Sequence, residues 1–394
     1  MRIRYFSDIR FPLERANGVQ TMETCHALAA RGHQVFLGVR PDTVRPPRDP
    51  LEFYGLPELP TLTIDRLRVA GSATVRRVLY CLFAVERTVC CRSDVILTRD
   101  LGVASVLLNI PRWLRPPVVF ESHGFSPVFA ETMNELVSGG ARADQAKRDR
   151  LFRREERVWK FADGYVATTK TLAVELESKF GPRENAVSIS NGVRVLPNRR
   201  FGSPATQTSP VVLYAGHLYP WRGVEVLLEA VLRLPEVHTV IVGGHPKEGD
   251  RLRLLHLATS LGISDRVDFI GMISVSEVQK KLADADVLVL PTTSTVSADR
   301  YTSPLKLFEY LAAGKPIVAS DLQSTREVLE HENNAILVTP SDADALADGI
   351  NRVLTDLPLA TRIAENAFRA ADHFSWEQRA ERVERLLDAV QKPE

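Results

Sequence analysis

Short apolar runs, separated by polar turns, recur along the whole chain, and their pattern predicts parallel β-strands. The runs are rich in Val and Ile and do not alternate strictly between apolar and polar residues. Such runs are typical of parallel strands that helices cover on both faces. The twelve runs are residues 3–7, 34–39, 94–98, 117–122, 164–169, 186–190, 211–216, 239–244, 267–271, 286–291, 316–320 and 335–339.

Helical patterns lie between these runs. Helices are expected over 20–31, which ends at Gly32, over 224–232, over 276–285 and, with an amphipathic pattern, over 375–390. Strand and helix therefore alternate through both halves of the chain. This alternation predicts an α/β fold of two doubly wound, Rossmann-like domains.

The length and local composition place the expected domain boundaries. A chain of 394 residues exceeds one ordinary core. The stretch 194–210 is irregular and rich in Pro, Ser and Thr, which marks the join between domains. We expect an N-terminal domain over 1–195, a C-terminal domain over 196–374 and a final helix within 375–394.

Composition and charge exclude several classes of protein. The 50 Lys and Arg residues balance 49 Asp and Glu residues, so a nucleic-acid partner is not expected. The N-terminus lacks the apolar core of a signal peptide, and no run of about 18 apolar residues occurs, which predicts a cytoplasmic protein. The four cysteines have no CxxC spacing, which favours buried free thiols over a zinc site.

One segment is dense in charge. Residues 140–160 combine many basic and acidic side chains in a helical pattern. The segment is interpreted as a solvated helix face, and the alternative is an interfacial helix beside anionic lipid. Any contact with a membrane is therefore expected to be peripheral.

The stretch SPLKLFEYLAAGKPIVASD, residues 303–321, predicts a helix that binds an anion at its start. Ser303 suits the N-cap and Pro304 the first helical position. The amides of Leu305 and Lys306 would then lack intrahelical partners and form a phosphate site. A lysine in the first turn is unfavourable beside the positive end of the helix dipole unless an anion is bound. The alternative is that Lys306 lies in solvent.

Glu309 follows one turn later in the same expected helix. It lies beside an apolar stripe, which is expected to be buried and consists of Leu305, Phe308, Leu311 and Ala312. Glu309 either forms an i, i+3 pair with Lys306 or accepts hydrogen bonds from the two hydroxyls of a ribose.

Three loops that follow expected strands carry further candidates, because ligands of open α/β folds bind at the carboxyl ends of strands. His217 and Arg222 lie in one loop, where Arg222 suits phosphate contacts or is a plain surface arginine. Gly18 follows the first strand, where it either lets the backbone approach a ligand or forms a simple turn. His123 follows Glu121 at the end of another strand and is either functional or structural. No GxGxxG fingerprint follows a strand, so a dinucleotide cofactor is not indicated.

Together these stretches resemble the GT-B glycosyltransferases of family 4, which are retaining sugar transferases. The resemblance covers nearly the whole chain and includes NGVQTMETCHALAARGHQV (17–35), SNGV (190–193), VDFIGMIS (267–274) and DADVLVLPT (284–292). It implies two Rossmann-like domains with a cleft between them. The acceptor would bind to 1–195 and the nucleotide sugar to 196–374, and the helix within 375–394 would cross back to the first domain.

The resemblance also implies roles for individual residues. Glu309 would hold the ribose, and Arg222 would neutralise the leaving group. Gly18 would approach the β-phosphate, Met272 would meet the base, and His123 would lie near the reacting carbon. The remaining diphosphate contacts would come from Ser303, Leu305, Lys306 and His217. Four positions depart from the family pattern. Tyr301 replaces a glutamate that faces the donor sugar, and His217 replaces the usual arginine. Arg194 replaces the aspartate of the usual NGVD, and Asn17 replaces a glycine of the usual glycine pair.

The implied function is retaining transfer of a hexose-type sugar from a nucleoside-diphosphate sugar to an acceptor hydroxyl. No cofactor or metal is expected, and a UDP-sugar is the favoured donor. The acceptor is a glycan, a lipid-linked molecule or a small molecule. Two alternatives stay open: a nucleotide-sugar epimerase of GT-B fold, and a non-catalytic binding or partner subunit, which Tyr301 and His217 suggest. A dinucleotide-dependent oxidoreductase is disfavoured by the missing fingerprint.

Overall fold

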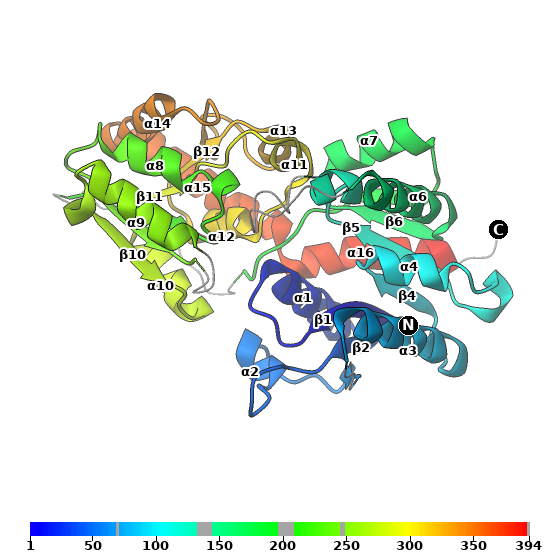
Figure 1. The fold of residues 1–394 in the computed structure, drawn as a ribbon. Helices are drawn as coiled ribbons and strands as arrows, with labels where there is room; N and C mark the ends of the chain where they lie inside the picture. The colour runs from blue at the N-terminus through cyan, green and yellow to red at the C-terminus, as the bar shows by residue number, and fades with distance from the viewer. Residues whose placement is uncertain (68–70, 132–143, 196–208, 245–248, 392–394) are drawn as a thin grey trace. The chain divides into compact units, whose positions relative to one another are not determined.

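The computed structural model describes residues 1–67, 71–131, 144–195, 209–244 and 249–391 (Figure 1). The chain forms two compact units. The first contains β1 to β7 and the C-terminal helix α16, and the second contains β8 to β13. The units divide between Asn191 and Gly192 and between Ser375 and Trp376. Most of the expected join at 194–210, and residues 140–143 of the charge-dense segment, lie outside the described residues.

The first unit is built on a seven-stranded parallel sheet in the order β3-β2-β1-β4-β5-β6-β7. The order reverses between β1 and β4, so the loops after these two strands open at a topological switch point. The strands are β1 (Arg2–Arg10), β2 (Gln34–Arg40), β3 (Leu62–Arg66), β4 (Val95–Thr98), β5 (Val118–Ser122), β6 (Gly164–Ala167) and β7 (Ala186–Ser188).

Helices cover both faces of this sheet because adjacent residues of a strand point to opposite sides. Tyr5 packs with α1 and α16, whereas its neighbour Phe6 packs with α3 and α4. The helix α16 contributes the fully buried Val383 and Leu387 to the first of these cores. The α-helices of this unit are α1 (Ala16–Ala30), α2 (Pro50–Tyr54), α3 (Ala73–Cys90), α4 (Leu101–Leu107), α6 (Gln145–Phe161), α7 (Lys170–Phe180) and α16 (Trp376–Gln391).

The second unit repeats this plan with six parallel strands in the order β10-β9-β8-β11-β12-β13. Its switch point lies between β8 and β11. The strands are β8 (Val211–Ala215), β9 (His238–Val242), β10 (Val267–Gly271), β11 (Val287–Leu290), β12 (Ile317–Ser320) and β13 (Ile336–Val338). Val212 and Tyr214 face one core, and Leu213 and Ala215 face the other.

The helices of the second unit lie on both faces of its sheet. The α-helices are α8 (Val224–Val231), α9 (Asp250–Ser260), α10 (Val275–Asp284), α11 (Val296–Tyr301), α12 (Leu305–Ala313), α13 (Gln323–Arg326), α14 (Ala343–Thr355) and α15 (Leu357–Ala370). A one-turn 3₁₀ helix, Pro220–Arg222, precedes α8.

The predicted α/β fold with parallel sheets is confirmed, and each of the twelve predicted runs contains a strand. The sequence analysis missed β3, because this edge strand is only partly buried and lacks a continuous apolar run. The cysteines are free, but the prediction that they are buried is wrong for three of them: Cys25 is buried, Cys81 and Cys91 are half-buried, and Cys90 is exposed. Within the described ranges, every helix is too short or too polar to cross a bilayer.

Candidate functional site

The start of α12 is an uncapped helix end in the second unit. The helix begins at Leu305, and Pro304 occupies the N-cap position with extended backbone angles. The prediction of Ser303 as N-cap and Pro304 as first helical residue is therefore wrong by one position. Pro304 has no side-chain group to donate or accept a hydrogen bond, so the N-cap residue does not cap this end. The first amides of α12 thus retain the capacity to bind an anion.

Lys306 lies in the first turn of α12 and is buried, so the alternative that it lies in solvent is wrong. The residue is 8% exposed, and its Nζ lies 3.9 Å from the centroid of the Tyr214 ring. Among the described residues, Nζ has no hydrogen-bond partner. Burial lowers the pKa of Lys306 well below its usual value; the Arg222 guanidinium lowers it further, and Glu309 opposes this shift.

The loop after β8 leaves space for this lysine. Gly216, the first residue of the loop, has a φ of +143°. A Cβ at this position would lie 3.0 Å from Lys306 Nζ, so a larger residue would press on the ammonium group. Gly223 ends the loop with a φ of +73°. A Cβ there would lie 1.6 Å from the carbonyl oxygen of Pro291, which is the residue that directly follows β11. Glycines therefore bring the two loops of the switch point together.

Aromatic rings stiffen the same loop. His217 stacks on Tyr219 with ring centroids 5.1 Å apart, and Tyr219 stacks on Trp221 at 4.6 Å. The Tyr214 hydroxyl donates to the carbonyl oxygen of His217 at 2.5 Å. The half-buried Arg222 follows this stack at the end of the 3₁₀ helix. His217 and Arg222 thus occur on one short, braced segment at the carboxyl end of β8.

Three other predicted donor residues lie in the second unit. Glu309 is half-buried one turn after Lys306 on α12. Met272 directly follows β10 and is 44% exposed. Tyr301 ends α11 and is 1% exposed, so its assignment to the donor sugar stays a prediction. The predicted apolar stripe of α12 is partly wrong: Leu305 and Ala312 are only half-buried, whereas Lys306, Leu307 and Tyr310 are buried.

Glu121 in the first unit is the centre of a buried polar network. This residue ends β5 and is inaccessible to solvent. Its Oε1 accepts hydrogen bonds from Gln20 Nε2 at 2.6 Å, from Arg379 Nη2 at 2.6 Å and from the His123 imidazole at 2.8 Å. Arg379 lies on α16 and also donates to the carbonyl oxygen of Ser190 at 3.0 Å. The final helix thereby supplies the counter-charge of Glu121.

This network sets the charge and the tautomer of His123. Burial opposes ionisation of Glu121, but Arg379 and His123 outweigh it and lower the pKa of Glu121 to about 2. Burial and Arg99 lower the pKa of His123 to about 4. His123 is therefore neutral at pH 7, and its Nε2 carries the proton because an ionised carboxylate only accepts. Nδ1 is left as a hydrogen-bond acceptor.

Gly18 lies in the first turn of α1, where the backbone is crowded. A Cβ at this position would lie 2.3 Å from the carbonyl oxygen of Leu13 and 2.5 Å from the Tyr54 hydroxyl. Glycine is therefore required for the packing of the loop against the helix. The amide of Gly18 donates to the carbonyl oxygen of Arg15 at 2.8 Å, so in this structure it already has a partner.

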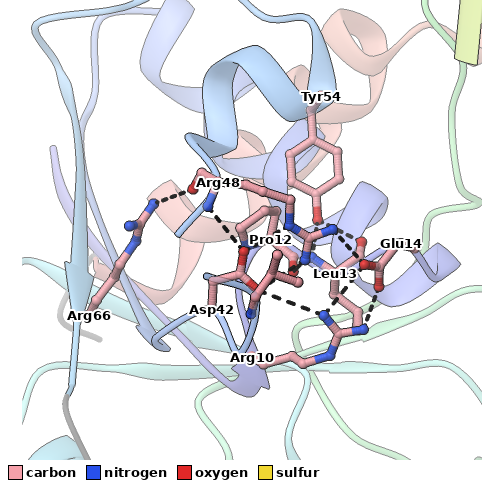
Figure 2. Close-up of polar contacts among 9 residues, drawn as sticks. Arg10, Pro12, Leu13, Glu14, Asp42, Arg48, Tyr54 and Arg66 are labelled. Carbon is pink, nitrogen blue, oxygen red and sulfur yellow. Dashed lines mark hydrogen bonds and ion pairs between the residues drawn. The ribbon is translucent and has the colours of Figure 1, made fainter. Parts of the chain in front are cut away.

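An ion-pair network, which the sequence analysis did not predict, holds the loop between β1 and α1 (Figure 2). The Arg48 guanidinium contacts Asp42 at 2.7 Å and Glu14 at 2.6 Å, and Arg10 contacts the other oxygen of Glu14 at 2.5 Å. The Tyr54 hydroxyl accepts from the amide of Leu13 at 2.8 Å and donates to its carbonyl oxygen at 2.7 Å. These contacts fix the loop that leads into Gly18, and no sequence motif signals them.

Family models match both halves of the chain. Residues 17–192 match the model described as "Glycosyl transferase 4-like domain", and residues 197–370 match "Glycosyl transferases group 1". The chain belongs to the family 4-like glycosyltransferases. Among curated relatives, it is 28% identical over 298 residues to the D-inositol 3-phosphate glycosyltransferase of Salinispora tropica, over 69% of this chain and 58% of the relative. The chain spans little more than half the length of the first curated relatives that it matches.

Solved structures show the same fold for this family 4-like chain. The sucrose-phosphate synthase of Thermosynechococcus elongatus matches with a TM-score of 0.76 at 20% identity, over 99% of this chain and 98% of that protein. Anabaena HepE in complex with UDP-glucose matches with a TM-score of 0.73 at 20% identity, over 99% of this chain and 100% of that protein. The fold is therefore GT-B, with two Rossmann-like domains.

Proposed function

We propose that this protein is a retaining glycosyltransferase that transfers a hexose from a nucleoside-diphosphate sugar to an acceptor hydroxyl. The observation that carries this proposal is the buried Lys306, whose ammonium group has no hydrogen-bond partner within the described residues and lies at an uncapped helix start. A buried cation is costly unless an anion accompanies it. A diphosphate would supply that anion.

The donor would occupy the carboxyl end of the sheet in the second unit. Arg222, Lys306 and the first amides of α12 would hold the diphosphate, and Glu309 would accept the ribose hydroxyls. The electrostatic influence of Arg222 and Glu309 on Lys306 supports a common site for these three side chains. A UDP-sugar is the favoured donor, in line with the UDP-glucose complex of the similar HepE structure.

The transfer would depend on electrostatic stabilisation of the leaving group. The acceptor oxygen bonds to the anomeric carbon, and the bond from that carbon to the β-phosphate oxygen breaks. Attack from the side of the leaving group retains the anomeric configuration and lets the hydroxyl proton pass to the departing diphosphate. Preorganised cations such as Arg222 and Lys306 lower the barrier because they need no reorganisation as charge develops.

His123 in the first unit would act as a neutral group near the reacting carbon. Its Nε2–H is held by Glu121, so Nδ1 is available to accept a hydrogen bond from a sugar or acceptor hydroxyl. The lowered pKa of about 4 is unsuited to a general acid at neutral pH. We therefore assign His123 to positioning of a substrate hydroxyl.

The test is thermal unfolding with UDP, GDP, ADP and TDP for the wild type, Glu309→Ala and Arg222→Ala. A nucleotide at 100 times its dissociation constant would stabilise the fold by about 2.7 kcal/mol. We expect one nucleotide to raise the midpoint of the wild type, and Glu309→Ala to reduce the shift. Glu236→Ala, an exposed carboxylate elsewhere in the second unit, serves as the control.

Turnover then separates a transferase from the alternatives. Glu309→Ala and Arg222→Ala are each expected to lower turnover at least tenfold, about 1.4 kcal/mol of barrier. Near-normal kinetics in both variants would refute the site. If no nucleotide shifts any midpoint, a non-catalytic partner subunit becomes the better interpretation. Conversion of the donor sugar without acceptor, followed by proton NMR, would identify an epimerase.

A further inference from the structure

A cavity of about 480 Å³ lies in the first unit at the carboxyl ends of β4 and β5. Arginines from three elements contribute to its wall: Arg77 from α3, Arg99 from the loop after β4, and Arg154 from α6. His123 lies on the same wall. The volume is within the range of small-molecule sites.

The acidic charge at this wall is already balanced. Asp100 is the one acidic residue among the described residues that line the cavity. Its Oδ1 accepts from the amides of Gly102 and Val103, and its Oδ2 accepts from Arg77 Nη1 at 2.6 Å. Arg77 also contacts Asp8, which itself pairs with Arg40. The pKa of Asp100 is lowered despite burial, because Arg77 and the amides favour the ionised form.

The other two arginines have no acidic partner in the part of the chain that the structure describes. Arg99 Nη1 donates to the neutral side chain of Gln20 at 2.7 Å, and Arg99 forms no ion pair in the described part of the chain. Its pKa is lowered because burial disfavours the charged form. Arg154 has neither a hydrogen bond nor an ion pair to any described residue, although its neighbour Glu155 is held by Ser126. This wall therefore presents two guanidinium groups that form no ion pair with a carboxylate of the described residues.

We propose that this cavity binds the anionic group, a phosphate or a carboxylate, of the acceptor substrate, with Arg99 and Arg154 as its ligands. A planar guanidinium donates two parallel hydrogen bonds to either oxyanion. Because His123 shares the wall, an acceptor anchored in this way would present a hydroxyl to the residue assigned to substrate positioning. The inference rests on the proposed transferase function, since it names the class of acceptor.

The experiment compares four probes by calorimetry: glucose 6-phosphate, glucuronate, glucose and inorganic phosphate. The full chain is used with saturating UDP and without it, at constant ionic strength. We expect glucose 6-phosphate or glucuronate to bind and glucose not to bind. The charged sugar that binds more tightly shows whether the anionic group of the acceptor is a phosphate or a carboxylate.

Variants localise the binding to the cavity. Arg154→Ala is expected to raise the dissociation constant of the charged sugar at least tenfold, and Arg99→Gln to do the same if it folds. Arg153→Ala is the matched control, because Arg153 is also an exposed arginine on α6 but does not line the cavity. The control should leave the affinity unchanged within twofold.

Three outcomes overturn the proposal. They are equal binding of glucose and the charged sugars, an equal loss in Arg153→Ala and Arg154→Ala, and failure of both charged sugars to bind. Binding of UDP is recorded separately in every protein. If UDP binds and the charged sugars do not, only the acceptor inference fails; if UDP itself does not bind, the proposed function fails, while the arms without UDP still test the anion site.

Discussion

Replacement of Lys306 by methionine provides the sharpest test of the donor site, because it is expected to have opposite effects with and without nucleotide. Methionine keeps the length of the chain and removes the charge. At a pH below the lowered pKa of Lys306, the free wild type holds a buried ammonium group near the ring of Tyr214 at 3.9 Å, with no described hydrogen-bond acceptor. The substitution removes that desolvated charge, which is often neutral or stabilising.

The size of each effect follows from these contacts. The cation–π contact contributes on the order of 0.5–2 kcal/mol, which offsets part of the cost of burying the charge. We therefore expect the unliganded variant to be as stable as the wild type or up to about 2 kcal/mol more stable. A hydrogen bond to a charged group contributes roughly 1.5–3 kcal/mol, so the dissociation constant of UDP should rise about 10- to 150-fold.

Proton uptake gives a second readout of the same side chain. The pKa of Lys306 is lower in the folded protein than in the unfolded chain. Between that lowered value and about pH 10.4 the unfolded chain binds more protons, so the stability of the free protein rises with pH in this window. A bound diphosphate favours the ammonium form, so UDP binding within the window should take up a proton.

Calorimetry in two buffers of different ionisation enthalpy measures this uptake. At about pH 8.5 the phosphates of UDP are already deprotonated, because their last pKa is about 6. We expect uptake in the wild type and none in Lys306→Met. Lys315→Met, at the other end of α12, is the control and should behave as the wild type. The reasoning is refuted if Lys306→Met is less stable and binds UDP normally, since Lys306 would then only brace Tyr214.

Three further predictions concern the first unit. His123→Ala should lower transfer at least tenfold with the affinity for UDP unchanged, and loss of donor affinity alone would contradict its assigned role. Arg379→Met should lower the free energy of unfolding in urea by about 3–5 kcal/mol, because it leaves Glu121 buried without its counter-charge; a change below 1 kcal/mol would contradict this. Burial raises the pKa of Glu155 to about 7. The contribution of protonated Glu155 to the free energy of unfolding is therefore full below about pH 4.3 and is lost as the pH rises through 7. Glu155→Gln should therefore flatten the decline in stability between pH 5 and pH 8, on the order of 1–3 kcal/mol, whereas an unchanged pH profile would show that another group titrates.

The fold could be predicted because parallel strands covered on both faces leave a strong apolar signal. The missed strand β3 illustrates the limit of that signal, since an edge strand is only partly buried. Helix ends were less predictable. Ser303 and Pro304 satisfy the usual preferences for the start of a helix, yet the extended backbone at Pro304 moves the start to Leu305.

The environment of the candidate site could be predicted only in part, because its decisive contacts link distant segments. The sequence shows that Lys306 follows the apolar Leu305, but it does not show that Lys306 is buried. The burial of Lys306 depends on the absence of a side chain at Gly216. Glu121 and His123 are neighbours in sequence, whereas Arg379 joins them from 258 residues away. No local pattern encodes such a pair. The same reason explains why the contacts of Arg48 with Glu14 and Asp42 were missed.

The cations of this nearly neutral chain divide into two groups with different consequences. Arg379 and Arg48 meet carboxylates within the first unit, so their charges stabilise the fold and their loss leaves acids unpaired. Lys306 and Arg154 meet no carboxylate in the described residues, yet they occur at an uncapped helix start and on a cavity wall. Charges of the second kind add little to the stability of the free protein, so their substitution should affect ligand affinity instead. The pairing of each cation, rather than the net charge of +1, therefore separates structural from binding residues.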